Sequence, residues 1–200
     1  YVVDMDGVLA DFNTAFAKVL DPEGSIIPVT KGTWPEMWNW PHQYFPREYV
    51  DEAWDTVTQS PRFWRELGEF PWTSNTLHTL KKKQYFGDEI YFVTARPGNR
   101  VKLQTELWLR ERGYRDPTVI VVREDPPNYK WGVIRDIGAD VVIDDKPKIL
   151  TDSIVYAKPE AQLFLQVHPY NILFAETHAE RLGIIPVATP IRALKEVGTA

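Results

Sequence analysis

The sequence contains no cysteine among its 200 residues. Disulfide bridges, thiolate metal sites and cysteine nucleophiles are therefore excluded, and the composition is compatible with the reducing cytoplasm, where we expect the protein to reside. Long apolar runs are also missing, since stretches such as Val119–Val122 are far shorter than the ~20 residues of a membrane span. No charged and then apolar leader is visible. Because Tyr1 lies inside an expected strand, we expect a few residues, including the initiator Met, to precede it.

Positive charge is in short supply, because 23 Lys and Arg face 28 Asp and Glu, a formal net charge of -5. Sequence-independent binding to duplex nucleic acid depends on Lys and Arg that neutralise phosphates, so no duplex partner is expected. A small phosphorylated substrate stays compatible, because a bound metal ion can supply positive charge locally. The chain is 44% hydrophobic and 26% charged, which is typical of one globular domain or of a core domain with a modest insertion.

Short apolar, β-branched runs predict buried parallel strands. They are Tyr1–Val3, Glu89–Val93, Val119–Val122 and Val141–Ile143, with a weaker fifth at Ile172–Phe174. Helical patterns lie between and after them, at Val101–Arg112, Trp131–Ile137, Thr177–Leu182 and Ile191–Val197, and a glycine follows each of the last three. This alternation predicts an α/β fold with a Rossmann-like doubly wound parallel sheet, whose ligands bind beyond the carboxyl ends of the strands.

One long segment departs from the alternation. From about Phe12 to Lys83 there is no convincing strand, although Glu48–Val57 and Ser74–Lys83 have helical patterns. Six of the eight tryptophans lie there, namely Trp34, Trp38, Trp40, Trp54, Trp64 and Trp72. We therefore predict a mostly helical cap at residues 15–74, inserted between the first two sheet strands of a core formed by residues 1–14 and 75–200.

Paired carboxylates follow two of the predicted strands. Asp4 and Asp6 end the first strand, and Gly7 lets the backbone bend after them. Asp144 and Asp145 end the strand Val141–Ile143, so all four are expected at the same edge of the sheet. Such carboxylates repel one another unless a cation lies between them, and oxygen ligands from separate strands suit Mg²⁺.

Two further segments supply groups that can hold a phosphate. The second strand runs into Thr94-Ala95-Arg96-Pro97-Gly98, where a hydroxyl and free backbone N–H groups lead into a helix. Lys130 begins the helix before Asp144, and its ammonium can reach a negative centre at the sheet edge. Each signal is weak alone, but together and in this chain order they indicate phosphate chemistry.

The order Asp-x-Asp-Gly, Thr, Lys, Asp-Asp resembles the haloacid-dehalogenase (HAD) superfamily of phosphotransferases. The run from Asp4 to Phe12 is similar, more closely, to the first motif of the 5′(3′)-deoxyribonucleotidase family. Ser60-Pro61-Arg62-Phe63-Trp64 with Leu67 and Pro71 resembles that family's cap, and Pro169-Tyr170-Asn171 resembles a late segment of its bacterial and phage members. The resemblance implies a phosphatase acting on nucleoside, mainly deoxyribonucleoside, monophosphates, and it allows a homodimer.

The resemblance also implies roles for the motif residues. Asp4 would attack phosphorus and carry the phosphoryl group, and Asp6 would act as general acid and base. Mg²⁺ would be held by Asp4, by the backbone carbonyl of Asp6 and by Asp144 or Asp145, the choice between these two being open. Thr94 would bind a phosphoryl oxygen, and Lys130 would balance the charge of the aspartyl phosphate. The family usually has Thr-Ser where this chain has Thr94-Ala95, so one hydroxyl donor is lost. Whether Arg96 replaces that donor is open, and so is the substrate preference.

Aromatic residues are the candidates for holding the base. The family places a stacking residue at the position of Phe12, and Phe63, Trp64 and some of Trp34, Trp38 and Trp40 can complete an apolar slot. Ordinary structural explanations compete with these roles. Asp144-Asp145 and Thr94 can cap helices, Lys130 can be a surface lysine, Arg96 can form a structural ion pair, and each tryptophan can belong to the core.

Two other functions stay open at this stage. The phosphatase half of polynucleotide kinases shares this core order, so the chain can be a 3′-phosphatase of nucleic acid ends, although its acidic charge and large cap disfavour a polymer. A second alternative is a non-catalytic protein that binds nucleotides or single strands on a Trp-rich cap. The presence of Asp4, Asp6, Lys130 and Asp144 together argues against that alternative.

Overall fold

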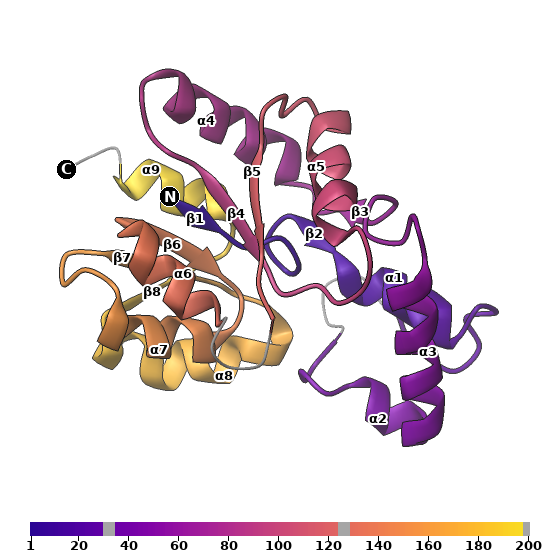
Figure 1. Ribbon diagram of the computed structural model, residues 1–200. Helices are drawn as coiled ribbons and strands as arrows, with labels where there is room; N and C mark the ends of the chain where they lie inside the picture. Colours follow the sequence, from indigo (N-terminus) through magenta and orange to yellow (C-terminus); the bar gives the residue numbers. More distant parts are fainter. Residues whose placement is uncertain (30–34, 124–128, 198–200) are drawn as a thin grey trace.

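The fold is built on one six-stranded parallel sheet with helices on both faces (Figure 1). The computed structural model describes residues 1–29, 35–123 and 129–197. The strand order is β5-β4-β1-β6-β7-β8, which places the first strand in the middle of the sheet. The strands are β1 (Val2–Val3), β4 (Tyr91–Thr94), β5 (Thr118–Val121), β6 (Val141–Asp144), β7 (Gln162–Gln166) and β8 (Ile184–Val187). This is the predicted Rossmann-like doubly wound arrangement.

The register of the sheet sends alternate side chains to opposite faces. Val3 pairs with Phe92 of β4 and with Ile143 of β6, and these three belong to the larger core cluster. Val2 pairs with Val142, and both belong to the second cluster on the other face. Both faces are therefore buried, which explains why these strands consist of continuous apolar runs.

Helices from different parts of the chain cover the two faces. The larger cluster includes residues of α4, α5 and α9, and the second includes residues of α6 and α7. These helices are α4 (Thr73–Tyr85), α5 (Val101–Glu111), α6 (Lys130–Ile137), α7 (Pro147–Tyr156) and α9 (Pro190–Glu196). Among the described residues, no helix combines the length and the apolar character needed to cross a membrane.

The regular structure of the segment between β1 and α4 is mainly helical, and the segment extends to one side of the sheet (Figure 1). It contains α1 (Phe12–Leu20), α2 (Pro41–Tyr44) and α3 (Arg47–Gln59), and α1 packs against α3. A small antiparallel pair, β2 (Ala10–Asp11) with β3 (Gly68–Glu69), joins the two ends of this segment. The division into a core and a cap at residues 15–74 stays a prediction.

The structure differs from the sequence-based prediction in several elements. Ile172–Phe174 is helical (α8) and not a strand, and it lies between the 3₁₀ turn η1 (Pro169–Asn171) and the π-helical turn η2 (Ala175–Ala179). The strands β7 and β8 were not predicted, and neither was β3 inside the segment expected to lack strands. Thr177–Leu182 is split between η2 and the 3₁₀ turn η3 (Glu180–Leu182). The predicted stops at Gly138 and Gly183 are confirmed by their left-handed backbone, whereas Gly198 lies outside the described residues.

Candidate active site

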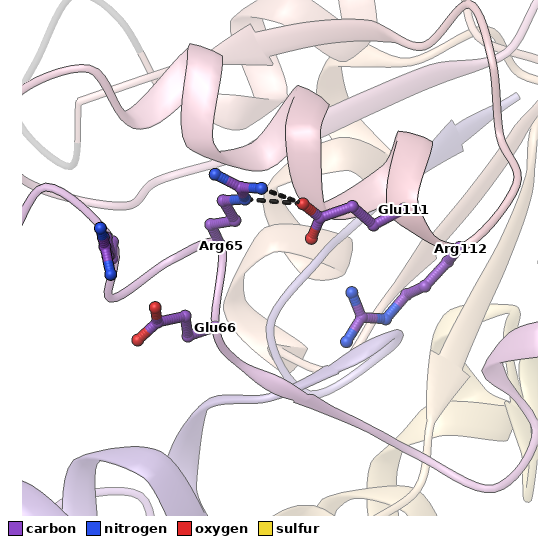
Figure 2. Close-up of a pocket in the computed structure, with 5 residues that line it drawn as sticks. Arg65, Glu66, Glu111 and Arg112 are labelled. Carbon is purple, nitrogen blue, oxygen red and sulfur yellow. Dashed lines mark hydrogen bonds and ion pairs between the residues drawn. The ribbon is translucent and has the colours of Figure 1, made fainter.

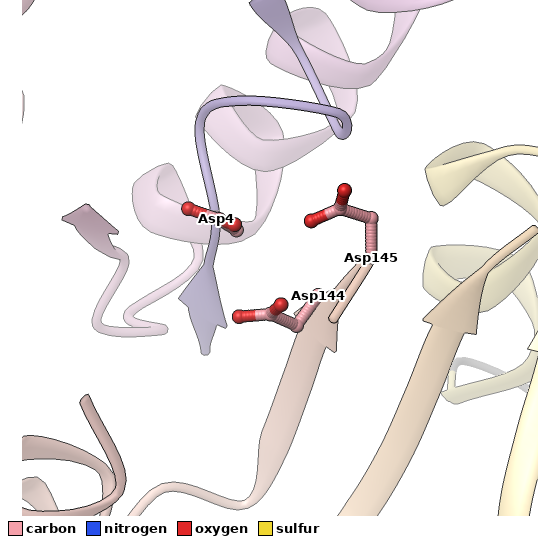
Figure 3. Close-up of side chains that lie close together, drawn as sticks. All are labelled: Asp4, Asp144 and Asp145. Carbon is pink, nitrogen blue, oxygen red and sulfur yellow. The ribbon is translucent and has the colours of Figure 1, made fainter. Parts of the chain in front are cut away.

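Three carboxylates converge at the carboxyl edge of the sheet (Figure 3). Asp4 follows β1 directly, Asp144 ends β6, and Asp145 is the next residue. Because β1 and β6 are neighbouring parallel strands, their carboxyl ends meet. Each of the three aspartates offers an oxygen within 4.8 Å of the others, and all three are buried. Three of the four acidic residues that were predicted to gather at this edge therefore form one cluster.

Lys130 places a buried cation between two of these carboxylates. It begins α6, and its Nζ lies 2.7 Å from Asp4 Oδ1 and 2.9 Å from Asp144 Oδ2. Burial alone would lower the pKa of Lys130, but the charges of Asp144 and Asp4 raise it well above its usual value. Lys130 is therefore a charged member of the cluster, and not a surface lysine.

Lys130 bonds Asp4 and Asp144, and Asp145 is the third carboxylate of the cluster. Its Oδ2 accepts a hydrogen bond of 2.5 Å from the Tyr170 hydroxyl, but its buried Oδ1 has no partner among the described residues. Burial, followed by the charges of Asp4 and Asp144, raises the pKa of Asp145 well above its usual range. Three buried carboxylates with one buried ammonium leave an excess of negative charge, so the residues present fit a divalent cation with oxygen ligands.

A late segment of the chain supports this cluster from the side. His168 Nε2 lies 2.5 Å from the carbonyl oxygen of Gly7, and the rings of His168 and Tyr170 stack at 5.0 Å. Asn171 donates to the backbone oxygen of Asp145 at 2.8 Å. Sequence reasoning assigned no role to His168 or Tyr170. The resemblance of Pro169-Tyr170-Asn171 to a family segment was the only signal that pointed to this place.

Gly7 is required by its surroundings and by its backbone. Its φ is +79°, and a methyl group there would collide with the Asp145 carboxylate and lie 2.8 Å from the Tyr170 hydroxyl. The loop that contains Gly7 is also fixed by residues at the start of α4, because Trp72 Nε1 donates to Val8 O and Thr73 Oγ1 donates to Leu9 O. The bend that follows Asp4 and Asp6 is thus held in place.

Gly7→Ala is expected to lower the free energy of unfolding by at least about 2 kcal/mol, because a left-handed backbone and a steric collision act together. Gly113→Ala is the matched control, since Gly113 has φ +80° with open space around it. We expect that control to cost about 1 kcal/mol, the backbone term alone. Urea unfolding of both variants measures the difference. Equal losses would contradict a packing role for Gly7.

The predicted phosphate-binding segment lies at the end of β4, beside β1. Thr94 is buried as the last residue of the strand, and Ala95 is partly buried. For Arg96 the sequence left a phosphate contact and a structural ion pair open, and in the structure its guanidinium forms a two-point ion pair with Asp6. The Asp6 carboxylate is therefore bonded to Arg96 and is not one of the three clustered aspartates. A metal contact of Asp6 was predicted through its backbone carbonyl, which this ion pair leaves unaffected.

Phe12 begins α1 and lies in a group of aromatic rings. Its ring stacks on Phe16, Trp54 and Trp64 at 5.3, 5.5 and 5.7 Å, and it meets the edge of Phe63 at 6.2 Å. The structure thus brings together Phe12, Phe63 and Trp64, as the sequence predicted. It adds Trp54, for which no role was predicted.

The other predicted aromatic residues differ in their exposure to solvent. Trp38 is 51% exposed and lies beside the acidic cluster, with its ring 5.1 Å from that of Tyr170 and 4.8 Å from Lys146 Nζ. Trp40 is only 2% exposed and donates to Asn13 Oδ1, and Trp64 is also 2% exposed. Trp34 lies outside the described residues. A ligand can reach Trp38 without rearrangement, but it can reach Trp40 or Trp64 only if neighbouring groups move.

A separate surface groove does not coincide with this site (Figure 2). Its volume is about 490 Å³, and its lining is charged, with both signs present. Arg65 pairs with Glu111, and Arg112 pairs with Glu69. Partly exposed pairs of this kind contribute little to stability and present no cluster of catalytic groups. The acidic cluster is therefore the better candidate for chemistry.

Comparison with known proteins points to nucleotide hydrolysis in similar chains. A protein from Bacillus cereus is 35% identical over 107 residues, which are 48% of this chain and 51% of that protein. A protein from Oceanobacillus iheyensis is 32% identical over 97 residues, 48% of either chain. Both carry the name "Putative nucleotidase". The chain spans about half the length of these curated relatives. No protein-family model matches it.

Proposed function

We propose that this protein is a magnesium-dependent phosphomonoesterase of the HAD type, which hydrolyses nucleoside monophosphates, mainly deoxyribonucleoside monophosphates, through an aspartyl phosphate on Asp4. The observation that carries the proposal is the buried set of Asp4, Asp144 and Asp145 around Lys130. The names of the two similar bacterial proteins support the same reaction class.

Asp4 is the proposed nucleophile because it is the carboxylate at the centre of the sheet edge. The backbone N–H of Met5 and the ammonium of Lys130 both bond its Oδ1, at 2.7 Å each, and so fix the orientation of the carboxylate. Burial raises the pKa of Asp4 and the charge of Lys130 opposes that rise. Lys130 thus favours the ionised form that attack requires, and it can later offset charge on the transferred phosphoryl group.

The proposed metal ligands are Asp4 and Asp145, with the backbone carbonyl of Asp6. Asp144 is already bonded to Lys130 and to the backbone N–H of Lys146, at 2.9 and 2.8 Å. Asp145 instead keeps an oxygen without a partner among the described residues. We therefore assign direct contact to Asp145 and a charge-balancing position to Asp144. A bound Mg²⁺ would neutralise phosphoryl oxygens and the clustered carboxylates.

Asp6 is the proposed acid and base. As an Asp4 oxygen bonds to phosphorus, the bond from phosphorus to the ribose oxygen breaks, and Asp6 gives its proton to that oxygen. Water then attacks the aspartyl phosphate and gives a proton to Asp6, which releases orthophosphate and restores both aspartates. Thr94 would donate to a phosphoryl oxygen from the end of β4.

The base would lie among the aromatic residues beside this edge. Phe12, Phe63 and the exposed Trp38 are the proposed contacts, and a base stacked on such a ring gains about 1–3 kcal/mol. The buried Trp40 and Trp64 would support them from behind, and Ala95 would contribute its backbone and small side chain to the phosphate end.

Comparison of two substrates tests this function. We expect kcat/KM for a deoxyribonucleoside 5′-monophosphate to exceed that for a 3′-phosphorylated oligonucleotide by at least about tenfold. Faster turnover of the oligonucleotide would replace the proposal by a 3′-phosphatase. Tight oligonucleotide binding without turnover of either substrate would instead indicate a binding protein.

A further inference from the structure

Arg96 has a fully enclosed charged side chain near the proposed site. Its side chain is 0% exposed, whereas that of Asp6 is 25% exposed. Arg96 Nε donates to Asp6 Oδ2 at 2.9 Å, and Nη2 donates to Asp6 Oδ1 at 2.7 Å. A planar guanidinium bonded at two points fixes both the position and the plane of a carboxylate.

The remaining sides of the guanidinium are held by the protein as well. Arg96 Nη1 donates to Thr105 Oγ1 of α5 at 2.9 Å, and the guanidinium carbon lies 5.0 Å from the ring centre of Trp64. Trp64 is itself fixed, because its Nε1 donates to Pro97 O at 3.1 Å. Arg96 is therefore committed to protein partners, and a phosphoryl group would have to displace one of them to reach it.

From this geometry we propose that Arg96 is a positioning residue for Asp6, and not a contact of the phosphoryl group. The inference rests on the proposed function and adds separate roles for two residues: Asp6 transfers the proton, and Arg96 positions Asp6. Arg96 holds the Asp6 carboxyl group so that its exposed side faces the leaving oxygen. Asp6 first takes up a proton from solvent and, in the first step, gives it to that oxygen. Arg96 keeps all of its own protons, and its ion pair with the Asp6 carboxylate is then restored.

This role has a consequence that depends on the leaving group. A nucleoside leaves as an alkoxide, which needs a proton from Asp6, whereas p-nitrophenolate is a weak base and leaves without one. Misplacement of Asp6 should therefore slow release of the nucleoside far more than release of p-nitrophenolate. Loss of a phosphoryl contact would slow both to the same extent.

The test compares wild type with Arg96→Lys in single-turnover experiments with Mg²⁺ present. One substrate is a nucleoside monophosphate, which releases a nucleoside, and the other is p-nitrophenyl phosphate, which releases p-nitrophenolate. We expect nucleoside release to fall by about 10²-fold or more and p-nitrophenolate release by less than about tenfold, with inhibition by inorganic phosphate unchanged. Arg112→Lys is the matched control, because Arg112 also lies over a tryptophan, 3.9 Å from the Trp108 ring, but outside the site. It should leave the ratio of the two rates as in wild type.

Thr105→Val provides a second variant if Arg96→Lys does not fold. It removes one hydrogen bond of Arg96 without touching Asp6, and it should lower the nucleoside rate selectively and by a smaller factor. Equal loss for both leaving groups, together with weaker inhibition by phosphate, would overturn the positioning role while leaving the phosphatase proposal intact. Failure of wild type to release either leaving group would overturn the proposed function, and this role with it.

Discussion

Asp4→Asn should lower the rate of phosphate release from nucleoside monophosphates by about 10³-fold or more, because the proposed nucleophile is lost. The fold should persist. Asparagine keeps a carbonyl oxygen for the Met5 N–H and the Lys130 ammonium, and it removes one of three buried negative charges. Phosphate release with Mg²⁺ and the thermal unfolding midpoint, measured on the same preparation, test both parts.

Asp152→Asn is the control for this substitution. Asp152 lies on α7 and pairs with Lys148 on the surface at 2.8 Å, so its loss should leave turnover near that of wild type. In wild type, acid quenching during turnover should trap phosphate on Asp4. Retention of more than about a tenth of the wild-type rate by Asp4→Asn would show that Asp4 is not the nucleophile.

Lys130→Met should produce the largest loss of stability among single substitutions at this site. Lys130 bonds Asp4 and Asp144 with a side chain that is only 4% exposed, so its removal leaves buried carboxylates without their cation. Breaking a buried pair by removing one partner costs about 3–5 kcal/mol. We expect a loss of this size in urea unfolding with a chelator present, together with loss of turnover.

Mg²⁺ should restore part of the stability of Lys130→Met, because the ion supplies positive charge to the same carboxylates. The rise in unfolding midpoint on adding Mg²⁺ should therefore be larger for this variant than for wild type. Lys148→Met removes an exposed lysine from a surface pair. Its unfolding midpoints with Mg²⁺ and with a chelator should both equal those of wild type. A Lys130→Met protein as stable as wild type in chelator would contradict the proposed charge balance.

Four strands, and the functional residues that follow them in the chain, could be predicted because their sequence signals are local. Strands β1, β4 and β6 are mainly apolar and lie inside the sheet, where both faces are buried, and the edge strand β5 is also mainly apolar. The run of β7 is bounded by Gln162 and Gln166, and β8 contains Pro186, so neither resembles a central strand. Pro186 is tolerated because β8 is an edge strand, a position that only the tertiary structure defines.

The candidate site shows the same division between local and long-range information. Residues directly after a strand, such as Asp4 and Asp145, could be placed at one sheet edge from topology alone. The bonds of Tyr170 to Asp145 and of Arg96 to Asp6 join residues 25 and 90 positions apart, and no sequence period reports such contacts. Ile172–Phe174 was mistaken for a strand because three apolar residues carry no periodicity.

The most direct test of the account is phosphate release from a panel of nucleoside 5′-, 3′- and 2′-monophosphates, measured with Mg²⁺ and with a chelator. We expect release from one class of nucleotide, deoxyribonucleoside monophosphates above all, that depends on Mg²⁺ and disappears with the chelator. Absence of metal-dependent release from every nucleotide in the panel would contradict the proposed function.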